Sequence, residues 1–189
     1  LENTVMLYIL QFSNMALGLL TQAKRAQNAL AGMSQADLDR ITAAISAAGA
    51  EHAARLAAMA VEETGFGKKE DKEIKNRFAA LTLYDAIKDE KTHGILAENP
   101  EKRVIDIGVP VGIVAGLVPS TNPTSTVIYK AMICLKAGNP IIFSPHPSAV
   151  GCIMETVKVI RQAAERHVDI ICFPEMFSTG YSPSIIGPK

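Results

Sequence analysis

Apolar side chains recur every three to four positions through much of the first half of the chain, from about residue 21 to residue 91. This spacing is typical of amphipathic helices, and it predicts one helix over residues 34–64 and another over residues 70–91. Ser34 and Asp37 have the spacing of a capping box at the start of the first. The second should bury one apolar face, made of Ile74, Phe78, Leu81, Tyr84 and Ile87.

The pattern changes after residue 102. Short runs rich in valine and isoleucine, over residues 103–118 and 140–143, alternate with helical patterns over residues 124–137 and 148–165. Strands that alternate with helices of this length favour βαβ units and a parallel sheet. The sequence therefore predicts an α/β fold, in which N-terminal helices precede a partial Rossmann-like parallel sheet.

The two ends of the chain carry further apolar segments. Near the start, "VMLYILQFSNMALGLL" is interrupted by polar residues, and we interpret it as a buried strand followed by a turn. Near the end, "VDIICFPE" predicts another strand, with Asp169–Phe173 at its centre. An open edge on a partial parallel sheet would leave backbone amides unpaired, so we expect the chain to self-associate.

Composition narrows the range of partners. The chain has 189 residues, 48% of them hydrophobic, and 19 basic residues balance 19 acidic ones. Such neutrality gives no electrostatic basis for binding nucleic acid or an anionic membrane. The three cysteines, Cys134, Cys152 and Cys172, do not have the spacing of a metal site or of a disulfide framework. We therefore expect buried, reduced thiols and no metal site, as in a cytoplasmic protein.

Candidate chemistry lies in the polar turns that follow two of the predicted strands. In an open α/β sheet, ligands bind beyond the carboxyl ends of the strands, and a helix that begins there offers unpaired amides. Hydroxyl and amide side chains at such ends suit a nucleotide phosphate, a ribose or a developing oxyanion. They are equally common as turn and capping residues. The candidate cofactor-binding residues are Pro119, Ser120, Thr121, Ser144, Pro145, His146 and Pro147.

Two long segments carry a family resemblance. "EETGFGKKEDKEIKNRFAALTLYDAIKDEKTHGIL" and "GVPVGIVAGLVPSTNPTSTVIYKAMICLKAGNPIIFSPHP" closely resemble the CoA-acylating aldehyde dehydrogenases, over about residues 21–166. The resemblance implies the N-terminal part of that family's cofactor domain. It also implies NAD as cofactor, with NADP not excluded, and coenzyme A and an aldehyde as substrates.

The resemblance also implies roles for individual residues. The family has a proline–aromatic–asparagine turn whose asparagine amide helps to hold the thiohemiacetal oxyanion. Asn122 is the candidate for this donor. Thr121 is the alternative, because it is the third residue counted from Pro119, where the family has its asparagine. The family's lysine–proline turn, which contacts the adenosine ribose, corresponds to residues 144–147, where the lysine is absent. His146 could contact a phosphate there, or could cap the turn.

In the reaction that the family carries out, a cysteine thiolate attacks the aldehyde, hydride passes to the nicotinamide and the thioester passes to coenzyme A. Cys134, Cys152 and Cys172 do not resemble the catalytic motif. We therefore expect this chain by itself to be inactive.

The ends resemble a different family. "RHVDIICFPEMFSTGYSP" is similar to the second strand of the nitrilases, or carbon–nitrogen hydrolases, and "MLYILQFSNM" weakly resembles their first strand. This resemblance implies nitrilase-like segments over residues 1–20 and 167–189, with Glu175 as general base. A carbon–nitrogen hydrolase fragment and a non-catalytic α/β nucleotide-binding module are therefore the alternatives to an acylating aldehyde dehydrogenase.

Overall fold

The computed structural model describes the backbone of residues 2–164 and the side chains of residues 17–164. The helices are α1 (Glu2–Ala31), α2 (Gln35–Glu51), α3 (Ala53–Thr64), α4 (Lys69–Arg77), the π-helical turn η1 (Phe78–Thr82), α5 (Leu83–Ile87), α6 (Pro123–Lys136), the 3₁₀ turn η2 (Pro147–Ala149) and α7 (Val150–Ala164). The strands are β1 (Gly94–Asn99), β2 (Val104–Gly108), β3 (Val114–Val118) and β4 (Ile141–Pro145).

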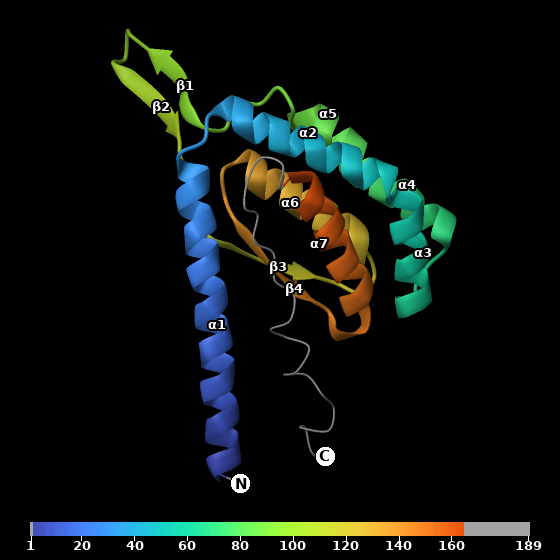
Figure 1. Ribbon diagram of the computed structural model, residues 1–189. Coiled ribbons are helices and arrows are strands. Elements are labelled where there is room, and N and C mark those ends of the chain that lie inside the picture. The colour runs from blue at the N-terminus through green and yellow to red at the C-terminus, as the bar shows by residue number, and fades with distance from the viewer. Residues whose placement is uncertain (1, 165–189) are drawn as a thin grey trace.

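Three layers form the body of the molecule (Figure 1). Strands β3 and β4 make a small sheet, α6 and α7 lie over it, and α2 crosses above both helices, with α3, α4 and α5 continuing that outer layer. The core lies between the layers, where the side chains of Ile41, Ile45, Ile128, Met132 and Ile153 are fully buried. This arrangement confirms the predicted α/β fold with N-terminal helices.

The parallel pairing of β3 with β4 is also as predicted, and its register runs from Val114 opposite Ile141 to Val118 opposite Pro145. Helix α6 connects the two strands, which makes this a βαβ unit. Gly116 lies where the sheet is crowded, because a Cβ atom at that position would come within 2.8 Å of Ile141 Cδ1.

Strand β2 does not join that sheet. It pairs antiparallel with β1, a strand absent from the sequence prediction, and the two form a hairpin that projects from the body (Figure 1). Only residues 100–103 separate the two strands, a connection that suits antiparallel neighbours and is too short for a parallel crossover. The prediction of a continuous parallel sheet from residue 102 onward was therefore wrong in its first part.

The predicted strand near the N-terminus was also wrong. Residues 2–31 form one long helix, α1, which runs alongside the body (Figure 1). A helix satisfies its own backbone hydrogen bonds, whereas a strand here would need a partner strand. No proline interrupts this segment, and its Leu, Met, Ala and Gln residues are good helix formers. The nitrilase-like first strand over residues 1–20 is thus absent, and the second nitrilase-like strand lies outside the described residues.

The sequence correctly predicted where one helix begins and where another ends. Ser34 Oγ accepts a hydrogen bond from the Asp37 amide, and the Asp37 carboxylate accepts one from the Ser34 amide, so the capping box is present. The Ser34 hydroxyl also donates to the Asp37 carboxylate at 2.7 Å, and this bond, followed by the bond from the Ser34 amide and by the nearby Arg40, holds the pKa of Asp37 below its ordinary value. Gly65 adopts a left-handed conformation, φ +69°, and ends α3.

The buried face predicted for the segment from α4 to α5 was wrong for Ile74, Phe78 and Leu81, whereas Tyr84 and Ile87 pack against the core as predicted. Ile74 and Phe78 are 65% and 64% exposed, while Lys72, Asn76, Ala79 and Ala80 are buried. The small alanines allow close packing: a Cβ atom added at Gly49 of α2 would lie 3.1 Å from Ala80 Cβ. Asn76 Nδ2 donates to Ala53 O at 3.0 Å, so polar contacts and small side chains, more than hydrophobicity, determine which face is buried.

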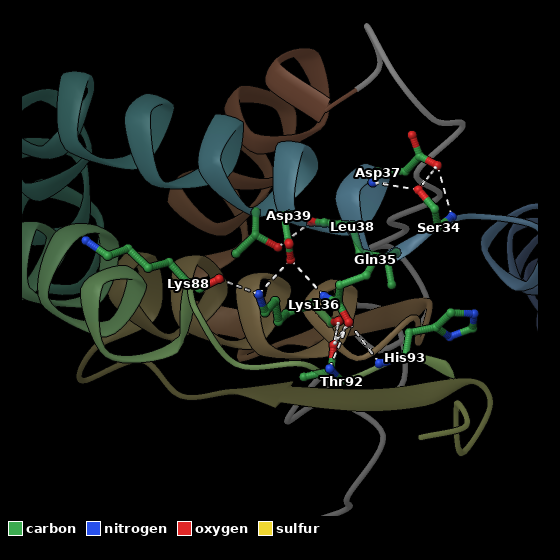
Figure 2. A network of polar contacts seen from close by, with 10 residues as sticks. Ser34, Gln35, Asp37, Leu38, Asp39, Lys88, Thr92, His93 and Lys136 are labelled. Carbon is green, nitrogen blue, oxygen red and sulfur yellow. Dashed lines mark hydrogen bonds and ion pairs between the residues drawn. The ribbon is translucent and has the colours of Figure 1, made fainter. Parts of the chain in front are cut away.

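A polar network ties the outer layer to the end of α6 (Figure 2). The Lys136 ammonium is almost fully buried and donates to Asp39 Oδ1 at 2.6 Å and to Lys88 O at 2.8 Å. Gln35 Oε1 accepts hydrogen bonds from the amides of Thr92 and His93, at 2.8 and 2.9 Å. Because a buried ammonium must be paired, this network fixes α2, α6 and the base of the hairpin relative to one another.

Within residues 2–164, no helix combines the length and the apolar character that crossing a membrane requires.

Candidate functional site

The two candidate turns lie side by side, because they follow strands that are paired. Val118 and Pro145 are opposite each other at the carboxyl end of the β3–β4 ladder, and the His146 amide donates to Val118 O at 2.9 Å. Residues 119–122 leave β3 and residues 146–147 leave β4 at this same edge. The two turns therefore meet at the carboxyl edge of the sheet, where ligands bind in open α/β sheets.

The first turn ends at the N-terminus of α6, where Asn122 is the N-cap residue. Its side chain makes no capping hydrogen bond to the helix. Pro123 at the first helical position has no amide proton, and the amides of Thr124 and Ser125 have no partner within the helix. The cap of this helix therefore does not neutralise its positive end, where Thr124 is buried and Ser125 is half-buried.

Two lysines of α4 contact this turn. Lys72 Nζ donates to Thr121 O at 2.7 Å, and Lys75 Nζ donates to Asn122 Oδ1 at 3.0 Å. The sequence prediction missed both, because the segment "KKEDKEIK" has the composition of a solvated helix start. The available signal was their spacing of three residues, which places both on one helical face.

Lys72 is a buried cation, with a relative exposure of 5%. Burial, followed by the nearby charge of Lys75, holds the pKa of Lys72 below its ordinary value. Among residues 17–164, no carboxylate forms a salt bridge with Lys72. Its hydrogen bond to Thr121 O offsets part of the free-energy cost of burying the ammonium. Together with Lys75 it makes the surroundings of the first turn positive.

The second turn is capped by His146, whose Nδ1 accepts from the Ser148 amide at 3.2 Å and lies 2.8 Å from Ser148 Oγ. This confirms the capping alternative for His146. A backbone N–H can only donate, so Nδ1 is the acceptor and the proton of the neutral ring is on Nε2. The side chain is exposed, and contact of Nε2–H with a phosphate remains a prediction.

Glu63 of α3 already occupies the N-terminus of α7. Its Oε1 accepts from the Gly151 amide at 2.7 Å and its Oε2 from the Cys152 amide at 2.6 Å. The expectation that both helices would present free amides was therefore wrong for α7, because a carboxylate far away in the sequence neutralises that terminus. An anionic ligand at this edge would meet an open terminus only at α6.

The remaining candidate residues differ in accessibility. Pro119, Thr121 and Pro147 are exposed, Ser120, Asn122 and Ser144 are half-buried, and Pro145 is buried as the last residue of β4. Glu175, the general base of the nitrilase-like alternative, lies outside the described residues.

Neither described cysteine has the environment of a nucleophile. Cys152 is buried, and its Sγ donates to Ala149 O at 3.4 Å. Burial, followed by the hydrogen bond and charge of Glu63, raises the pKa of Cys152 to about 12. Burial also raises the pKa of Cys134. Both are free thiols, as the sequence predicted.

Comparison with known proteins connects this site to a family. The model of the aldehyde dehydrogenase family matches residues 15–169. The chain is 47% identical over 146 residues to the bifunctional aldehyde-alcohol dehydrogenase AdhE of Escherichia coli, a match that covers 77% of this chain and 16% of that protein. The chain thus spans about one sixth of that relative's length.

Solved structures agree. An acetylating aldehyde dehydrogenase from Geobacillus thermoglucosidasius has a TM-score of 0.84 and 51% identity, covering 90% of this chain and 39% of that one. A propionaldehyde dehydrogenase from Rhodopseudomonas palustris, solved with bound CoA and an acylated cysteine, has a TM-score of 0.67 and 28% identity, covering 86% and 38%. With the family match extending over most of its length, the chain belongs to the aldehyde dehydrogenase family.

Proposed function

We propose that the chain is the N-terminal cofactor-domain part of an NAD-dependent, CoA-acylating aldehyde dehydrogenase. The reaction of the whole enzyme converts an aldehyde, coenzyme A and NAD to an acyl-CoA and NADH. The observation that carries this proposal is the pairing of Val118 with Pro145, which puts the Asn122 turn and the His146 turn at one sheet edge. The similarity to acetylating and propionaldehyde dehydrogenases supports the acylating chemistry.

The proposed role of Asn122 follows from the charge that develops in the reaction. Attack of a thiolate on an aldehyde turns the carbonyl oxygen into an oxyanion, which a preorganised N–H donor stabilises. The Asn122 amide stands at the open, positive end of α6, beside Lys72 and Lys75. Thr121 stays the alternative donor, although its exposed side chain is less well fixed than the half-buried Asn122.

The same edge is the proposed site for the adenosine part of NAD, and for coenzyme A in turn. NADP is not excluded as the cofactor. A hydroxyl at Ser144 can bind a ribose, and the Nε2–H of His146 can donate to a phosphate. Because Glu63 closes the α7 terminus, the phosphates should interact with the N-terminus of α6, whose surroundings Lys72 and Lys75 make positive.

The first prediction concerns nucleotide affinity. We expect this chain to bind NAD and coenzyme A with a dissociation constant on the order of 1 mM, about 4 kcal/mol, because a half-site cannot offset the full cost of immobilising a ligand. The substitution Ser144→Asp should weaken binding at least severalfold by repelling the phosphates. Backbone amide shifts of residues 119–122 and 144–147, followed during NMR titration, give the measurement.

The matched control is Asn99→Asp, which adds the same charge on the exposed β1–β2 hairpin and keeps the oxygen that accepts from the Lys102 amide at 3.0 Å. Its affinity should equal that of the unmodified chain. Absence of any shift at both turns with excess NAD or coenzyme A would contradict the proposed cofactor site.

A second prediction follows from the thiolate that the reaction requires. With a pKa of about 12, Cys152 is ionised to only about one part in ten thousand at pH 8. In the native chain it should therefore resist iodoacetamide at pH 8, and it should be alkylated rapidly after unfolding in guanidinium chloride. Peptide mass spectrometry distinguishes it from the other cysteines. Rapid native labelling of Cys152 would contradict its description as a buried thiol that stays protonated.

We also propose that the chain self-associates, and that its location is cytoplasmic. The β1–β2 hairpin exposes Ile105 and Ile107 at 56% and 60%, and its outer strand edges have unpaired amides. Light scattering at tens of micromolar should give a mass above the 20.2 kDa of the monomer.

The double substitution Ile105→Lys with Ile107→Lys should shift this mass toward the monomer, because it places charge on the exposed apolar face. Glu98→Lys on the same hairpin, where the residue is already polar, should leave the mass unchanged. A monodisperse monomer of the unmodified chain at that concentration would refute self-association.

A further inference from the structure

The side chain of Asn122 is held by another helix and not by its own. Asparagine at an N-cap position normally accepts a hydrogen bond from an amide in the first turn of its helix. In this structure no such bond forms, and Asn122 Oδ1 accepts from Lys75 Nζ at 3.0 Å. The orientation of the amide is therefore set by α4.

The chemistry of lysine determines which end of the amide faces it. An ammonium has three donors and no acceptor, so the oxygen of Asn122 must point toward Lys75. The NH2 group then points away from Lys75, and no hydrogen bond among the described residues uses it. A charged donor on the oxygen draws electron density from the amide, which strengthens its N–H groups as donors.

Lys72 fixes the backbone beside this amide. It lies one turn before Lys75 on the same face of α4, it is buried, and its Nζ donates to Thr121 O at 2.7 Å. Helix α4 is in turn bound to α6, because Thr124 Oγ1 donates to Asn76 Oδ1 at 2.8 Å. Three hydrogen bonds thus connect α4 to three residues of this turn, Thr121, Asn122 and Thr124, and leave the turn little freedom to rotate.

We propose that Lys75 is a positioning residue for the reaction: it orients and polarises the Asn122 amide toward the oxyanion, while Lys72 holds the backbone of the same turn. The proposal deepens the proposed function and rests on Asn122 being the oxyanion donor. Lys75 itself does not touch the substrate in this account and acts through Asn122.

The test uses the full chain with ¹⁵N-labelled asparagine, and it follows the side-chain NH2 resonance of Asn122, assigned by its loss in Asn122→Ala. Lys75→Met should displace this resonance, because the charged donor is gone and the amide is free to rotate. Lys75→Arg should return it toward its original position, since a guanidinium also donates. Lys69→Met is the matched control: it removes the same charge from the first turn of α4, where the side chain is exposed and contacts no part of the turn.

Thermal denaturation should show no large loss of stability in Lys75→Met, because Lys75 is exposed, and Lys75→Gln offers a second neutral variant. An Asn122 resonance unchanged in both neutral variants would overturn the proposal. So would equal displacement in Lys69→Met, or failure of Lys75→Arg to restore the position. This readout needs no ligand, so it is separate from the nucleotide titration, whose failure would count against the proposed function instead.

Discussion

The parallel pairing of β3 with β4 is the constraint on which the proposed site depends. Two turns that are more than 20 residues apart in the sequence meet only because Val118 and Pro145 are neighbours in one ladder. Any slip of register by one residue would turn the side chains of a strand to the opposite face and separate the turns. Helix α6 supports this register, because it packs on both strands and lies between them and α2.

Polar contacts from the outer layer then make the N-termini of α6 and α7 differ in charge. At α7, the carboxylate of Glu63 uses the amides of Gly151 and Cys152, so that terminus is neutralised from within the chain. At α6, the contacts come from lysines, which donate to the turn and do not compete for its free amides. The α7 terminus thus serves a contact within the chain, and the α6 terminus remains suited to binding a negatively charged group.

Local signals in the sequence predicted local structure well. The capping box at Ser34, the stop at Gly65 and the alternation of strands and helices after residue 110 all depend on neighbours in the chain. Non-local contacts decided the error at α4, whereas the errors at residues 2–31 and at the β1–β2 hairpin concerned local structure. Residues 2–31 form a helix, β2 pairs with β1, and α4 buries Lys72 and Asn76 in place of its apolar stripe.

The residues of the candidate site also divide into those that local sequence identified and those that depend on distant partners. Residues 119–122 and 144–147 could be identified because turn residues follow apolar runs, and the family resemblance selected Asn122 among them. Lys72, Lys75 and Glu63 were missed, because their partners lie 47 to 89 residues away. In an isolated sequence, charged residues on a helix are most often solvated, and only the tertiary arrangement shows that Lys72 is buried and that Lys75 and Glu63 bind partners on other elements.

Hydrogen exchange at the β3–β4 ladder tests this account most directly. Val114 N donates to Pro140 O and His146 N donates to Val118 O, both at 2.9 Å, at the two ends of the ladder. If the ladder positions the site, both amides should exchange with solvent only when the described structure unfolds as a whole. The free energy of opening at these two amides should then be well above the value at the amides of the β1–β2 hairpin. Exchange of the Val114 and His146 amides as fast as those of the hairpin would contradict the account, because the two turns would then not be held together.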